Sequence, residues 1–104
     1  MAQSLASSGV HLDPVRLADL CRRFGVRELS VFGSAARNAL RPDSDLDLLV
    51  EFQPGARIGI FKFGALTREL QTLAGRPVDL VTKTGLKPWI RDRVLLEART
   101  LYAA

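Results

Sequence analysis

The chain of 104 residues contains a single cysteine, Cys21, and a single histidine, His11. One cysteine cannot form a disulfide within the chain, and this pair cannot supply the four ligands of a structural zinc site. Cys21 falls on the apolar stripe of an expected helix, so we interpret it as a core residue rather than a nucleophile. These absences are typical of a reducing compartment, and we expect the protein to be cytoplasmic.

Long hydrophobic runs and clusters of basic residues are also missing. No apolar stretch approaches membrane-spanning length, and the segment MAQSLASSGVHL lacks the basic and apolar regions of a signal peptide. The formal net charge is +4, from 15 basic and 11 acidic residues that are scattered along the chain. This pattern argues against a membrane protein and gives poor support for direct nucleic-acid binding. The phosphate-binding motifs GxxxxGKS/T and GxGxxG are absent as well.

Apolar periodicity and chain breakers predict alternating helices and strands. We expect a flexible N-terminus over 1–12 and one domain over 13–104. Asp13 and Pro14 are typical of a helix start. In chain order, the expected elements are a helix over 14–24, a strand over 27–33, a short helix over 34–40, a strand over 44–52, a helix over 63–74, a strand over 76–82, a helix over 88–98 and a short strand over 99–103. The residues expected to point inward from the last helix are Ile90, Val94, Leu95 and Ala98.

This order of elements predicts an α/β (α+β) fold in which helices flank a small mixed β-sheet. The first two strands are connected by only a short helix and a turn, which is short for a parallel crossover. We therefore expect these strands to be antiparallel neighbours. The end of the first strand, at Gly33 and Ser34, would then lie beside Asp45 and Asp47 at the start of the second.

Three carboxylates are expected on one face of this sheet. Asp45 and Asp47 are two positions apart, so they point to the same side of a strand, and Asp79 reaches that side if the third strand pairs with the second. Like charges this close repel each other unless they are protonated or bind cations, and carboxylate oxygens suit Mg²⁺. Two Mg²⁺ ions shared by such carboxylates favour phosphoryl chemistry. The alternative is a solvated acidic edge.

An anion is expected next to these carboxylates. Ser34 would open the short helix, whose free N–H groups and dipole favour a phosphate. Arg37 lies one turn further along, where it either contacts the same anion or forms a surface ion pair. We assign Glu97, far along the chain, to the surface.

Residues 33–50, GSAARNALRPDSDLDLLV, resemble the Gly-Ser … Asp-x-Asp signature of the polymerase-beta-like nucleotidyltransferase superfamily. The short chain and the segment GRPVDLVT resemble its minimal branch, the MNT-type antitoxins that are paired with HEPN toxins. The resemblance covers residues 13–102 and implies the polymerase-beta-like nucleotidyltransferase fold. One position departs from the pattern, because the family commonly has glycine where this chain has Asn38.

Carried over to this sequence, the resemblance implies a complete set of site residues. The residues that it places at the nucleotide are Gly33, Ser34 and Arg37, and those that it places at the metal ions and in catalysis are Asp45, Asp47 and Asp79. Asp79 would also be the candidate base for the attacking hydroxyl. The implied cofactor is Mg²⁺, as two ions, and the implied nucleotide is ATP.

The activity that the resemblance implies is Mg²⁺-dependent transfer of AMP from ATP to a hydroxyl, with release of pyrophosphate. The implied acceptor is a tyrosine of a HEPN toxin, which the modification would silence. The alternative is a non-catalytic antitoxin that neutralises its toxin by binding and masking it, and Asn38 keeps this alternative open. A basic nucleic-acid binder is a third hypothesis, which the scattered charges support poorly. The acceptor, the base of the nucleotide and the oligomeric state stay open.

Overall fold

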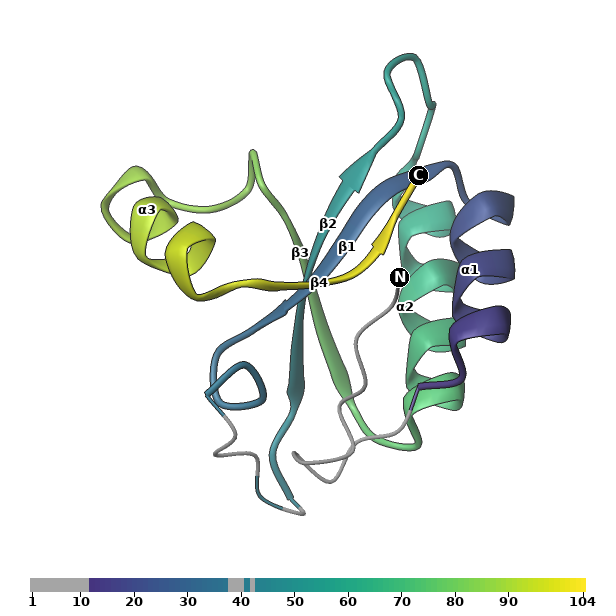
Figure 1. The fold of residues 1–104 in the computed structure, drawn as a ribbon. Helices are drawn as coiled ribbons and strands as arrows, with labels where there is room; N and C mark the ends of the chain where they lie inside the picture. The colour runs from purple at the N-terminus through teal and green to yellow at the C-terminus, as the bar shows by residue number, and fades with distance from the viewer. Residues whose placement is uncertain (1–11, 38–40, 42) are drawn as a thin grey trace.

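The computed structural model describes residues 12–37, 41 and 43–104. Figure 1 shows a twisted sheet with helices on both of its faces. The elements are α1 (Pro14–Arg23), β1 (Val26–Phe32), β2 (Leu46–Phe52), α2 (Ile60–Ala74), β3 (Val78–Thr82), α3 (Pro88–Glu97) and β4 (Arg99–Ala103). No helix of the described ranges is long and apolar enough to cross a membrane. The cytoplasmic location and the boundary between 1–12 and 13–104 stay predictions.

The four strands form one mixed sheet in the order β3-β2-β1-β4. Strand β1 pairs antiparallel with both β2 and β4, whereas β2 and β3 are parallel. The predicted antiparallel pair and the mixed sheet are therefore confirmed. In the register of this sheet, Asp47 is paired with Phe32 on one side and with Asp79 on the other.

One face of the sheet packs against α1 and α2, which lie side by side (Figure 1). The Asp13 carboxylate caps α1 by accepting hydrogen bonds from the N–H groups of Val15 and Arg16, at 3.0 and 3.4 Å. Such a cap stabilises a helix by about 1 kcal/mol. The core on this face includes Leu17, Leu20, Cys21, Leu29, Val31, Leu46, Leu48, Val50, Leu66, Leu70 and Leu80. Cys21 is fully buried, which raises the pKa of its thiol to about 12 and confirms it as a core residue.

The opposite face of the sheet carries α3 (Figure 1). The apolar residues that join this helix to the sheet are Phe32, Leu49, Val81, Leu86, Ile90 and Val94. The prediction that Leu95 points inward is wrong, because its side chain is exposed. Ile90 and Val94 are one helical turn apart and form the buried stripe, whereas Leu95 lies about 100° further around the helix.

The predicted helix over 34–40 is not present in residues 34–37, which form a turn. The Arg37 N–H donates to the carbonyl oxygens of Gly33 and Ser34, at 3.3 and 3.2 Å. Only Ala35 is buried among these four residues. A segment with so little apolar surface to bury lacks the packing that stabilises most helices in proteins. Residues 38–40, including Asn38, lie outside the described residues.

Candidate functional site

The predicted site residues meet at the end of the sheet where β1 ends and β2 begins. Asp47 is the second residue of β2, and its register pairs it with Asp79 of the neighbouring strand β3. Asp45 directly precedes β2. Gly33 follows the last residue of β1 and lies against the Asp47 side chain. The juxtaposition that the sequence predicted is present, while the roles of these residues stay predictions.

Gly33 has a geometric reason to be glycine. Its φ of +69° lies in the left-handed region, which side chains with a Cβ rarely adopt. A Cβ at this position would also collide with the Asp47 carboxylate, with the Cγ of Asp47 only 3.2 Å away. Glycine therefore allows the chain to turn immediately after β1 and allows an acidic side chain to lie directly against its backbone.

The carboxylates of Asp45, Asp47 and Asp79 influence one another. Burial raises the pKa of Asp47, and the charges of Asp79 and Asp45 raise it further, while Arg37 acts in the opposite direction. Asp47 is half-buried, and the other two are exposed. Across residues 12–37, 41 and 43–104, no three acidic, histidine or cysteine side chains converge as a ready metal centre. Carboxylate oxygens are nevertheless the ligands that Mg²⁺ prefers, and a bound cation would offset the burial and the repulsion that together raise the pKa of Asp47.

Arg37 forms an ion pair across the site with Glu97, the last residue of α3. Its Nη1 donates to Oε1 and Oε2 of Glu97, at 3.2 and 3.1 Å. Glu97 Oε1 also accepts a hydrogen bond from the Gly33 N–H, at 3.2 Å. Of the two roles considered for Arg37, the ion pair is the one observed here.

Glu97 was missed by reasoning from the sequence. Its assignment to the surface is wrong, since only 25% of its side chain is exposed and its carboxylate contacts two predicted nucleotide-binding residues. One weak signal exists in the sequence. An acidic residue in the last turn of a helix is disfavoured by the helix dipole, so Glu97 requires a compensating partner elsewhere.

The anion site at Ser34 also differs from the expectation. Ser34 lies in the turn over 33–37, so the argument from a helix dipole does not apply to the described residues. The donors near this turn include the Ser34 hydroxyl, the Gly33 N–H and the Arg37 guanidinium, and the last two contact Glu97. Consecutive amides of a tight turn can bind an anion without a helix.

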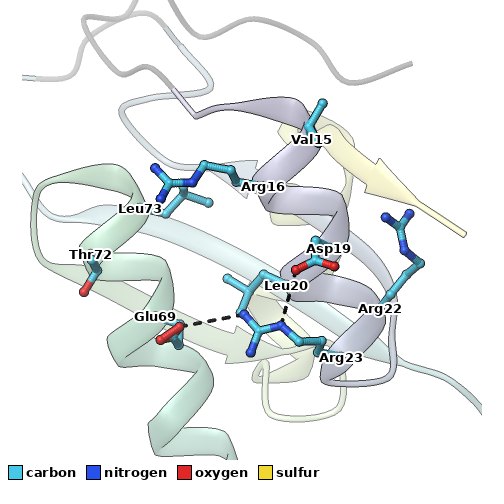
Figure 2. Close-up of a pocket in the computed structure, with 9 residues that line it drawn as sticks. All are labelled: Val15, Arg16, Asp19, Leu20, Arg22, Arg23, Glu69, Thr72 and Leu73. Carbon is cyan, nitrogen blue, oxygen red and sulfur yellow. Dashed lines mark ion pairs between the residues drawn. The ribbon is translucent and has the colours of Figure 1, made fainter.

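A separate groove of about 530 Å³ lies between α1 and α2. Figure 2 shows that Arg23 bridges the two helices, with Nε 3.4 Å from Asp19 and Nη2 3.9 Å from Glu69. The residues lining the groove include none of the predicted site residues. Exposed ion pairs of this kind contribute about 0–1 kcal/mol. We therefore interpret this groove as the outer seam between two packed helices.

Comparison with known proteins assigns the chain to a family. The model of the nucleotidyltransferase domain matches residues 17–102. The protein adenylyltransferase MntA of Thermococcus cleftensis is 46% identical over 79 residues, which are 76% of this chain and 78% of that protein. A solved structure described as a minimal nucleotidyltransferase is 42% identical, with a TM-score of 0.71 over 83% of this chain and 86% of that one.

The fold extends to more distant structures. A toxin–antitoxin crystal structure with AMP-PNP has a TM-score of 0.71 and 19% identity, over 89% of this chain and 75% of that one. At this identity the likeness concerns the fold alone. Together with the family match, it confirms the polymerase-beta-like architecture that the Gly-Ser … Asp-x-Asp stretch indicated. The chain therefore belongs to the nucleotidyltransferase domain family and is an enzyme of its minimal branch.

Proposed function

We propose that this protein is an antitoxin that transfers AMP from ATP to a hydroxyl of a partner toxin. The observation that carries the proposal is the meeting of Gly33 and the turn after it with Asp45, Asp47 and Asp79 at one end of the sheet. Donors for phosphate and ligands for a cation then stand side by side, as transfer from a nucleoside triphosphate requires. The similarity to a protein adenylyltransferase supports a protein as the acceptor.

Asp45, Asp47 and Asp79 would hold Mg²⁺, in our proposal as two ions. Their oxygens are the hard ligands that this cation prefers, and their mutual repulsion disfavours three charged carboxylates in the absence of a cation. When bound, Mg²⁺ neutralises charge on the phosphates and orients them for displacement. Asp47 is the least exposed of the three, and its side chain lies against the backbone of Gly33, where the turn begins.

Other residues of the chain would bind the triphosphate, and one carboxylate would accept the proton. The N–H of Gly33, the Ser34 hydroxyl and the Arg37 guanidinium would donate to the triphosphate. The acceptor oxygen attacks the α-phosphorus, the bond from that phosphorus to the leaving oxygen breaks, and pyrophosphate departs. Asp79 would take the proton of the attacking hydroxyl as a general base.

We propose a HEPN toxin as the partner and a tyrosine of that toxin as the acceptor. The toxin–antitoxin complex that shares this fold supports a protein partner, and its AMP-PNP supports an adenine nucleotide. The exposed apolar residues of α3, Trp89 and Leu96, are 77% and 88% accessible and offer a surface for such a partner.

The test is transfer to the partner, read by intact mass. The purified chain is incubated with a HEPN toxin, ATP and Mg²⁺, and the toxin is expected to gain the mass of one or more AMP groups. Asp79→Asn should still bind ATP but lower the transfer rate by about 10²–10⁴-fold, as loss of a general base does. Asp43→Asn is the matched control, because Asp43 is an exposed acidic residue of the turn before β2.

Two outcomes would contradict the enzymatic proposal. One is a toxin that stays unmodified while it binds the chain in a one-to-one complex and loses activity, which favours masking. The other is an Asp79→Asn variant that protects cells as well as the native chain while no AMP-sized mass addition appears on the toxin. A masking protein must remain bound in stoichiometric amounts, whereas a catalyst acts on many toxin molecules.

A further inference from the structure

The Glu97 carboxylate contacts two of the three donor groups that the proposed function assigns to the nucleotide. It accepts hydrogen bonds from the Gly33 N–H at 3.2 Å and from the Arg37 guanidinium at 3.1 and 3.2 Å. We propose that the Glu97 carboxylate competes with the triphosphate for these donors. A phosphate group then has to displace Glu97 before it can accept hydrogen bonds from them. This inference rests on the proposed function and adds a residue outside its signature motif.

The geometry makes the two ligands mutually exclusive. Glu97 Oε1 is shared by Gly33 and Arg37, so the carboxylate closes the space between a backbone donor and a cation. Carboxylate and phosphate offer the same kind of acceptor, an anionic oxygen that binds Arg in a forked arrangement. A single N–H makes one strong hydrogen bond. A phosphate oxygen at the Gly33 N–H therefore requires that Glu97 leave.

The charges at this end of the sheet lead to the same conclusion. Asp45, Asp47 and Asp79 make the neighbourhood acidic, and Arg37 is the cation that acts on Asp47. While Arg37 is paired with Glu97, the positive charge that it offers to a triphosphate is partly neutralised. Removal of the Glu97 charge would free the guanidinium and remove a source of repulsion from the phosphates.

Displacement of Glu97 requires little movement of the backbone. Glu97 ends α3, and two residues later Arg99 is paired with Val31 in the sheet, which anchors the chain at this point. The Glu97 side chain is 25% exposed, so it can rotate toward solvent. Its carboxylate also stands at the negative end of the α3 dipole, where the helix does not favour it. The contact with Gly33 and Arg37 is therefore the main reason for its position, and neutral substitution should leave the fold intact.

Calorimetric titration of Glu97→Gln tests this inference. We expect the variant to bind Mg²⁺-ATP and Mg²⁺-tripolyphosphate on the order of 10-fold more tightly than the native chain, because a charge-assisted hydrogen bond no longer has to be broken. Binding of adenosine should be unchanged, since it carries no phosphate. Asp92→Asn is the matched control, as it removes the same charge from an exposed position of the same helix and should leave all three affinities unchanged.

The results distinguish a failure of this inference from a failure of the proposed function. If the native chain binds Mg²⁺-ATP and Glu97→Gln binds it equally well or more weakly, Glu97 is not a competitor and the inference is overturned. If Glu97→Gln and Asp92→Asn gain affinity equally, the effect is one of overall charge, and the inference is again overturned. If no form binds ATP or tripolyphosphate, the proposed function fails and the inference fails with it. Glu97→Ala, which removes the carboxylate entirely, should show the same gain in affinity. This second variant keeps the test valid if one of the two misfolds.

Discussion

Adding one methyl group at Gly33 tests the geometry on which the site depends. With φ at +69°, an alanine here would be held in the left-handed region, at a cost of roughly 1–2 kcal/mol. Its Cβ would also overlap the Asp47 carboxylate, so that side chain would have to turn away from the backbone. Alanine restricts the unfolded chain as well, which offsets the strain by roughly 0.4–1 kcal/mol.

Together the strain, the collision and this offset lower the free energy of unfolding of Gly33→Ala by about 1–3 kcal/mol. For a chain of this size, the melting temperature should fall by roughly 4–8 °C per kcal/mol. Nucleotide transfer should fall by at least ~100-fold, because displacement of Asp47 misplaces a proposed metal ligand. Urea titration followed by circular dichroism measures the stability, and intact mass of the toxin measures the transfer.

Gly75→Ala is the matched control for this substitution. Gly75 has φ of +71° at the end of α2, and the methyl group that alanine adds there meets no described atom within 4 Å. It therefore carries the backbone strain without the collision. The stability difference between the two variants isolates the contact with Asp47. That contact is refuted if the two variants are equally stable and if Asp47→Ala does not restore stability to Gly33→Ala in a double-mutant cycle.

Two further predictions concern ionisable groups. Asp47→Asn should abolish transfer yet raise the free energy of unfolding of the metal-free protein by a few tenths to about 1 kcal/mol, because a charge is no longer buried and like charges are relieved. The pKa of Asp47 is higher in the folded state than in the unfolded state. Asp47 therefore stabilises the folded native chain at pH below the ordinary Asp pKa, and this contribution to the free energy of unfolding is lost as the pH rises through the raised pKa. The stability gap between variant and native chain should accordingly widen from acidic to neutral pH, and a constant gap would contradict the raised pKa. Cys21, whose burial raises its pKa to about 12, should resist iodoacetamide in the native protein at neutral pH and react after unfolding in urea. Rapid labelling of folded protein would contradict its place in the core.

Local signals explain why much of the fold could be predicted from the sequence. Asp13 and Pro14 mark the start of α1 because a cap and a fixed φ act within a few residues. Gly75 ends α2 in the left-handed conformation that glycine adopts without strain. The antiparallel pairing of β1 and β2 followed from the length of the chain between them, which is another local property.

Errors arose where the outcome depends on distant residues. A helix was predicted over 34–40 because its residues are good helix formers. The described residues 34–37 form a turn instead, because helix formation depends on packing that these four residues lack. Leu95 was predicted as buried because the apolar pattern of α3 is broad. Of this pattern, only the stripe of Ile90 and Val94 packs against the sheet. The width of a helix that a neighbouring surface covers depends on the tertiary structure and cannot be predicted from local sequence.

By itself, the sequence determined which chemical groups are available and that the turn after Gly33 would lie near the carboxylates of Asp45 and Asp47. Only the tertiary structure decided what each group contacts. The register of parallel strands pairs Asp47 with Asp79, and the path from α3 into β4 carries Glu97 to Gly33 and Arg37, about 60 residues earlier in the chain. Periodicity and spacing report on neighbours in sequence, whereas an ion pair between remote elements depends on how the whole chain packs.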